Sequence, residues 1–203
     1  MSFPIVVLVS GEGTNLQAIL DGVHGGDAEV VGVAASRAEA RGLERARAAG
    51  VQTAVFAIAD HRDSAARDAA LADWIDGFGA RLVVLAGFME LLGSEFIGRF
   101  RNAIINVHPA LLPAFPGVRA IEQALEYGVK LAGVSVHFVD EGVDSGPIIL
   151  QRSFELPYPR DIAAVEQKVH EIEHELLPQA VRLIAQGRVR VDPADPRWVV
   201  VDD

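Results

Sequence analysis

The sequence has no cysteine among its 203 residues. This absence excludes disulfide bonds, thiolate nucleophiles and cysteine-ligated zinc sites. The chain also has no apolar run of about eighteen residues, the length that marks a membrane-spanning helix. Its first apolar run, residues 5–9, has neither the basic flank nor the cleavage site of a signal peptide. Together these absences predict a cytoplasmic protein that does not enter a membrane.

Basic residues are in the minority, since 18 Lys and Arg face 28 Asp and Glu and the formal net charge is −10. Nucleic acid is not expected as a partner, because duplex binding needs clustered cations to displace counterions. Aromatic residues make up only 6% of the chain, but half of it is hydrophobic, which is enough for one well-buried core. We expect residues 1–203 to form a single domain, as a monomer or homodimer, whose partners are small molecules.

Strand and helix patterns alternate along the first half of the chain. The opening apolar run from Pro4 is followed by a glycine turn and by a helix that Thr14 or Asn15 can cap. Further strands are predicted at residues 30–34, 51–57 and 82–86, and helices at 38–49 and within 63–78. Such alternation predicts an α/β fold with a doubly wound, mostly parallel sheet.

The second half of the chain adds different elements. A buried strand is predicted at residues 103–107 and a helix at 118–127. Residues 131–139 alternate, with Ser135 and His137 on one face, and pair with residues 148–156 as an antiparallel extension. A long C-terminal helix over residues 162–185 carries apolar residues at steps of three and four, with a kink expected at Pro178. The tail, residues 189–201, is predicted to form a small hairpin.

Two polar residues, Asn106 and His108, lie at the carboxyl end of the buried strand predicted at 103–107. The carboxyl ends of parallel strands are where open α/β sheets collect ligands, and the prolines of residues 109–116 stiffen the loop that follows. Asn106 can donate to an oxyanion, and Asp144 can favour the protonated, donating form of His108. Without a cysteine or a serine elbow, the site favours direct attack of a substrate amine on a polarised carbonyl. His137 is interpreted as a structural strand histidine.

The glycine turn after the first strand has Gly11 and Gly13 but not the third glycine of the dinucleotide fingerprint. The second strand also ends without an acid for a ribose, so NAD is not expected. The backbone N–H groups of Gly13, Thr14 and Asn15 at a helix N-terminus instead predict a site for a single phosphate. A plain strand–helix turn remains the alternative.

Residues 170–174 read HEIEH and match the zincin pattern, with two histidines on one helix face. A catalytic zinc needs a third protein ligand, only 29 residues follow the motif, and the neighbouring glutamates are equally typical of a solvated face. We therefore expect no metal. Glu173 is a candidate acceptor for a polar substrate group, with an ordinary surface glutamate as the alternative.

Six segments in order carry a family resemblance over nearly the whole chain. They are SGEGTNLQAI (10–19), GLERARAAG (42–50), VVLAGFM (83–89), INVHPALLPAFPG (105–117), SVHFVDEGVDSGPII (135–149) and HEIEHELLP (170–178). With these segments the chain resembles the phosphoribosylglycinamide formyltransferase family, the folate-dependent transformylases of purine synthesis. The resemblance implies a Rossmann-like formyltransferase fold, with a phosphate-binding half (residues 1–102) and a catalytic, folate-loop half (residues 103–203).

The resemblance also implies a reaction. The amine of glycinamide ribonucleotide would attack the formyl carbon of the cosubstrate 10-formyltetrahydrofolate, giving formylglycinamide ribonucleotide and tetrahydrofolate. Asn106 and protonated His108 would stabilise the tetrahedral oxyanion, and Asp144 would support the charge on His108 and relay protons.

Binding residues follow from the same resemblance. The residues implied to bind the ribonucleotide are Gly13, Thr14, Asn15, His170 and Glu173. Those implied to bind the folate are Arg62, Met89, Glu90, Leu91, Leu92, Asn106, Asp140, Glu141, Gly142, Val143 and Asp144. The pterin contacts are expected largely from backbone groups. Glu90 stands where the family commonly carries a basic residue.

Three alternatives remain. A formyltetrahydrofolate hydrolase would use water as acceptor and usually carries an amino-terminal regulatory domain, whereas the first strand here starts near Pro4. A transfer-RNA formyltransferase needs a basic carboxyl-terminal domain. A non-catalytic nucleotide or folate module would have little use for Asn106, His108 and Asp144 together.

Overall fold

The computed structural model describes residues 2–159 and 161–202 and divides the chain into two units. The first unit ends at Ile105 and the second begins at Asn106, so the boundary lies inside strand β5 (Ile104–His108). Each unit is described by itself.

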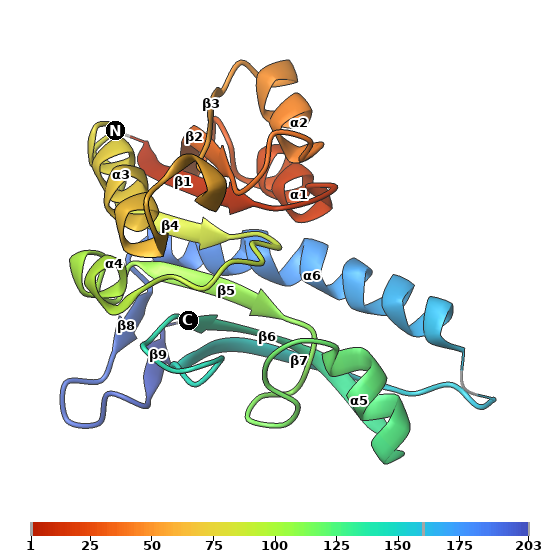
Figure 1. Cartoon of the computed structure of the whole chain (residues 1–203). Helices are drawn as coiled ribbons and strands as arrows, with labels where there is room; N and C mark the ends of the chain where they lie inside the picture. Colours follow the sequence, from red (N-terminus) through yellow and green to blue (C-terminus); the bar gives the residue numbers. More distant parts are fainter. Residues whose placement is uncertain (1, 160, 203) are drawn as a thin grey trace. The chain divides into compact units, whose positions relative to one another are not determined.

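The first unit is built on parallel strands in the order β3-β2-β1-β4. Their bounds are β1 Phe3–Val9, β2 Ala28–Ala35, β3 Gln52–Val55 and β4 Leu82–Leu85. Its helices are α1 Thr14–Gly22, α2 Gly42–Ala48, α3 Ser64–Asp76, α4 Ser94–Arg99 and the 3₁₀ turn η1 Ile58–Asp60. In Figure 1 this unit runs from red through yellow to light green, with α1 beside α2 and α3 beside α4.

Burial on both faces explains the uninterrupted apolar run of β1. Val7 pairs with Val33 on one side and Val84 on the other, and all three side chains are inaccessible to solvent. Strands covered on both faces read as continuous rather than alternating apolar runs. A close approach then fixes the turn after β1, because a Cβ on Gly13 (φ 71°) would lie 2.5 Å from Cα of Gly42.

The second unit contains an antiparallel pair and a long helix. Strands β6 (Leu131–Phe138) and β7 (Ile148–Glu155) pair antiparallel, and α6 (Ile162–Ala185) packs against both. Helix α5 (Ala120–Tyr127) contacts α6, and β8 (Val189–Val191) pairs with β9 (Val199–Val201) as a hairpin. The apolar stripe predicted for α6 is largely buried, and Asp161 caps its start by accepting from two backbone N–H groups.

The α/β class, the antiparallel extension and the long C-terminal helix are confirmed. Several boundaries differ. Helix α2 starts at Gly42 rather than 38, because residues 37–41 form turns and the Gly42 N–H bonds to the Gly11 carbonyl. Strand β3 is shorter than predicted because β2, its partner, ends at Ala35. Helix α5 starts two residues late, after Arg119 in a left-handed conformation (φ 59°).

Helix α4 is absent from the sequence prediction. Its six residues are too few for a helical repeat to be recognised, and Gly98 lies among them. Among the residues that the structure describes, no helix is both long and apolar enough to cross a membrane.

Candidate active site

His108 lies at the end of β5 with only 4% of its surface exposed. Its Nε2 lies 2.8 Å from the backbone oxygen of Phe115, and its Nδ1 lies 3.3 Å from Oδ2 of Asp144. A carbonyl oxygen can only accept, so Nε2 carries a proton. A lone pair on Nδ1 would then face the carboxylate. Both ring nitrogens of His108 therefore face acceptor oxygens.

Asp144 connects several groups of this site. Its Oδ2 accepts from the Gly117 N–H at 2.8 Å, and its Oδ1 lies 3.4 Å from Nδ2 of Asn106. Burial is the largest influence on the pKa of Asp144 and raises it. The contact with His137, the Gly117 N–H and the charges of His108 and His137 outweigh burial, so the pKa lies below its ordinary value of 3.8. Asp144 is thus held as a carboxylate, in a left-handed backbone conformation (φ 50°).

His137 belongs to the same cluster. Its Nδ1 donates to the backbone oxygen of Phe138 at 2.8 Å, as expected for a satisfied strand histidine. Its Nε2 lies 3.4 Å from Nδ2 of Asn106 and 3.5 Å from Oδ1 of Asp144. The sequence interpretation placed His137 outside the chemistry. The signal that could have included it is the alternation of β6, which puts His137 on the same strand face as Ser135.

Ser135 holds the loop that follows His108. Its fully buried hydroxyl donates to the Ala110 oxygen at 2.6 Å and accepts from the Leu112 N–H at 3.1 Å. Gln151 on β7 reaches both the Ser135 hydroxyl and the Leu112 oxygen, at 2.8 and 3.0 Å. Side chains of two strands therefore satisfy the backbone groups of a proline-rich loop, which has few bonds of its own to supply.

Removing this hydroxyl should destabilise the protein. Ser135→Ala leaves the Ala110 oxygen and the Leu112 N–H buried without their partner, so the free energy of unfolding should fall by about 1–3 kcal/mol. Urea denaturation followed by circular dichroism measures the change. Ser153→Ala, on an exposed position of β7, is the matched control and should change it by less than about 0.5 kcal/mol. Equal effects would show that the loop does not depend on Ser135.

The predicted substrate glutamate, Glu173, is 5% exposed on α6. Its Oε2 accepts from Nδ1 of His170 at 2.9 Å, and the His170 and His174 rings stack with centroids 6.2 Å apart. Within the described part of the chain, no group of three or more His, Cys, Asp or Glu side chains is arranged to hold a metal ion. In the HEIEH motif, Nδ1 of the first histidine is hydrogen-bonded to Glu173.

This pair gives a pH-dependent prediction. The hydrogen bond to Glu173 raises the pKa of His170 above 6.5, against a smaller lowering by burial, with further help from the charges of Glu173 and Glu166. The stability that the pair adds is complete below about pH 6.5 and is lost as pH rises through the raised pKa. NMR titration of the His170 ring measures this pKa. Glu173→Gln should lower it, Glu166→Gln should lower it less, and an unchanged value in Glu173→Gln would contradict the assignment.

In the first unit the predicted phosphate site lies at the start of α1. Gly13 takes the left-handed conformation before the helix, and no described side chain caps the start of α1. Three arginines on or before α2 gather at the preceding turn and were missed from the sequence. They are Arg37, bonded to the Ser10 oxygen, Arg41, bonded to the Glu12 carboxylate, and Arg45, bonded to the Glu12 oxygen. Their spacing of four residues is the signal that could have identified them.

The predicted folate segment begins beside this turn. Ser10 Oγ accepts from the Met89 N–H at 2.9 Å, so the loops after β1 and β4 are joined. Met89 and Leu91 are 76% and 80% exposed, so both side chains are accessible to a ligand. Arg62, the predicted folate arginine, is exposed and pairs with Asp63 at 2.9 Å. In the second unit the predicted folate loop at residues 140–144 is ordered by Asp140, whose Oδ1 accepts from Gly142 and Ser145.

Residues 3–181 match the family model described as formyl transferase. The chain belongs to the formyl transferase family. Phosphoribosylglycinamide formyltransferase of Haemophilus influenzae is 39% identical over 92% of this chain and 89% of that protein, and the Bacillus subtilis protein of the same name is 36% identical over 87% and 91%. The crystal structure of glycinamide ribonucleotide transformylase 1 from Symbiobacterium toebii superposes with a TM-score of 0.94 at 46% identity, covering 100% of this chain and 95% of that one.

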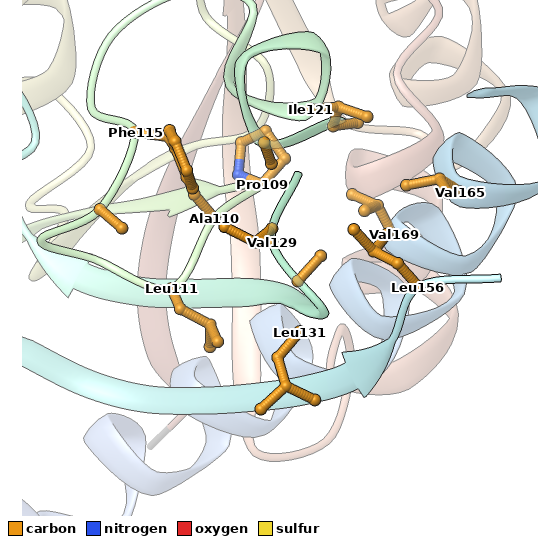
Figure 2. Close-up of a pocket in the computed structure, with 13 residues that line it drawn as sticks. Pro109, Ala110, Leu111, Phe115, Ile121, Val129, Leu131, Leu156, Val165 and Val169 are labelled. Carbon is orange, nitrogen blue, oxygen red and sulfur yellow. The ribbon is translucent and has the colours of Figure 1, made fainter. Parts of the chain in front are cut away.

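Beside the loop that follows β5 in this formyl transferase lies an apolar cavity of about 110 Å³ (Figure 2). All of its lining side chains are apolar. Pro109 and Phe115 of the loop face Val165 and Val169 of α6 across it, and Ala124 of α5 also lines it. Voids in a protein interior forfeit packing contacts, so this cavity leaves the loop less tightly packed than it could be.

Filling the cavity should stabilise the protein. Ala124→Leu places three more carbons beside the void at little cost in helix propensity, and the free energy of unfolding should rise by about 0.5–1 kcal/mol. Thermal unfolding measures the effect as a rise of about 1–4 °C in Tm. Ala163→Leu makes the same change at an exposed position of α6 and should leave Tm nearly unchanged. A lower Tm for Ala124→Leu alone would show that the cavity cannot accept the side chain.

Proposed function

We propose that this protein transfers the formyl group of 10-formyltetrahydrofolate to the amine of glycinamide ribonucleotide, in purine biosynthesis. The amine forms a bond to the formyl carbon, the bond from that carbon to N10 breaks, and the proton lost by the amine is balanced by one gained at N10. The observation that carries the proposal is Asp144, a carboxylate in reach of both Asn106 and His108. The named relatives support the choice of both substrates.

Asn106 and His108 supply the donors that the tetrahedral oxyanion needs. The contacts of Asn106 Nδ2 with Asp144 and His137 are both 3.4 Å, long for hydrogen bonds, so this donor can turn to a stronger acceptor. The Nε2 proton of His108, which now reaches the Phe115 oxygen, turns to the same oxyanion. Donors aimed at developing charge in a buried site supply a large share of catalysis.

Asp144 keeps His108 charged and is the acceptor for protons that leave the amine through water. Its low pKa suits the first task, because it restores the carboxylate once each proton has been passed on. In the first unit, Gly13, Thr14 and Asn15 hold the substrate phosphate at the start of α1, with Arg45 adding positive charge beside the turn. His170 and Glu173 bind the ribonucleotide, with Glu173 accepting from ribose hydroxyls.

Residues 89–92 and the loop at residues 140–144 bind the folate. The exposed side chains of Met89, Leu91 and Val143 offer apolar surface to a flat pterin. Arg62 remains the predicted side-chain contact to the folate in the first unit.

An absorbance assay for tetrahydrofolate formation from 10-formyltetrahydrofolate, run with and without glycinamide ribonucleotide, tests the proposal. Formation that requires the ribonucleotide supports the transferase. Formation in its absence would assign the protein as a hydrolase, and silence in both with folate still bound would assign it as a binding module.

A further inference from the structure

The backbone of residues 88–93, between β4 and α4, is held by side chains rather than by a helix or strand. Two of these side chains come from adjacent positions of α3. Arg67 Nη2 donates to the Leu91 oxygen at 3.1 Å, and Asp68 Oδ2 accepts from the Gly93 N–H at 2.8 Å. The guanidinium carbon of Arg67 also lies 5.8 Å from the centroid of the Phe88 ring. Three contacts therefore converge on one short segment.

The pair that makes these contacts is buried. Arg67 is inaccessible to solvent and Asp68 is 4% exposed, and Arg67 Nε donates to Asp68 Oδ1 at 2.6 Å. Charged residues are almost never fully buried, since the loss of hydration outweighs much of their mutual attraction. Among the described residues, Arg67 Nη1 has no hydrogen-bond partner, so its own hydrogen bonds do not fully compensate the buried guanidinium for lost hydration. Two apolar side chains would fill the same space without the cost of desolvating charges. We therefore attribute the charged pair to its contacts with residues 88–93.

We propose that Arg67 and Asp68 are positioning residues that fix residues 88–93 for folate binding. The inference rests on the proposed function, in which residues 89–92 bind the pterin largely through backbone groups. Backbone recognition requires that the main chain be held in place before the ligand arrives, because ordering a loose loop on binding weakens affinity. Arg67 binds the Leu91 carbonyl and Asp68 binds the Gly93 N–H two residues later. The pair therefore holds both an acceptor and a donor of this backbone.

Glu90 cannot supply a cationic contact from the segment itself, whereas Arg67 places a buried cation against the Leu91 oxygen. Arg67 is thus distinct from Arg62, whose exposed side chain bonds to Asp63 and can reach a ligand directly.

Steady-state kinetics with varied 10-formyltetrahydrofolate tests the role. Arg67→Met with Asp68→Asn removes both charges together, so no buried charge is left unpaired, and Arg67→Lys keeps the charge but gives one ammonium in place of the fork. The double variant should raise KM for the folate about tenfold, and Arg67→Lys about threefold, the size expected from losing a charge-assisted bond in whole or part. KM for the ribonucleotide should stay within about twofold in both.

Arg99→Gln is the matched control. Arg99 joins α4 to Asp73 and Asp76 of α3 through exposed ion pairs. Within the described part of the chain, it forms no ion pair with residues 88–93. The KM of the Arg99→Gln variant for folate should be unchanged. This control distinguishes a specific effect on residues 88–93 from a general weakening of the contact between α3 and α4.

An unchanged folate KM in the folded double variant, or an equal rise for both substrates, would overturn the positioning role. If the double variant does not fold, Arg67→Lys decides by the same two KM values. Calorimetric titration with tetrahydrofolate accompanies each variant. A wild type that binds tetrahydrofolate but shows no ribonucleotide-dependent turnover would refute the proposed function, and the Kd values would still decide the role of Arg67.

Discussion

Replacing His108 by alanine is expected to lower kcat by about 10²- to 10⁴-fold, the range for losing a positioned acid or a charged donor to an oxyanion. The reason lies in the two contacts of its ring, with the Phe115 oxygen at 2.8 Å and Asp144 at 3.3 Å, which place an acceptor at each ring nitrogen. The loss should fall on kcat more than on KM, because the oxyanion exists only along the reaction path. The tetrahydrofolate assay measures both.

His61→Ala is the matched control for this change. His61 lies in the first unit, where its ring stacks on Phe56 with centroids 6.3 Å apart, and its loss should leave kcat within about twofold. A folded His108→Ala protein with near-normal turnover would remove His108 from the mechanism.

Asp144→Asn is expected to lower kcat by about 10²- to 10³-fold, the cost of losing one electrostatic contribution to the transition state. Asparagine keeps the size of the side chain and an oxygen for the Gly117 N–H, but not the charge that supports His108. Stability should change with pH as well. Because the folded-state pKa lies below 3.8, the carboxylate stabilises the protein above about pH 4, and this contribution is lost as pH falls through the folded-state pKa.

Two measurements check this prediction. They are turnover at neutral pH, and urea unfolding of wild type and variant from about pH 3 to about pH 7, which covers the protonation of the carboxylate. Asp195→Asn is the control, since Asp195 also accepts a backbone N–H, from Arg197 at 3.0 Å, outside the site. Its turnover should be normal. A difference in unfolding free energy that does not shrink in acid would mean that the charge of Asp144 is not stabilising.

The parts of the fold that sequence could predict are those with a strong local repeat. Strand β1 and helix α6 were predicted within two residues of their observed bounds, because one is apolar throughout and the other repeats every three to four residues. Helix α4 and the start of α2 were not, because α4 has only six residues and the start of α2 depends on a bond to Gly11. Local pattern carries no information about such tertiary bonds.

The candidate site divides in the same way. The position of Asn106 and His108 at the carboxyl end of a buried strand could be inferred from the chain alone, because the apolar run that precedes them is local. The roles of Ser135 and Gln151 could not be inferred, because each acts on residues 16 to 39 positions away in the sequence.

The sequence by itself determined the α/β class, the chemistry available without cysteine, and the family through its ordered motifs. Only the tertiary structure decided which charges are buried and what they face. Arg67 and Arg62 both precede an aspartate in the sequence, yet one is inaccessible to solvent and holds the Leu91 oxygen while the other is exposed. Side-chain burial depends on which elements pack together, and that information is distributed over the whole chain rather than held in any one segment.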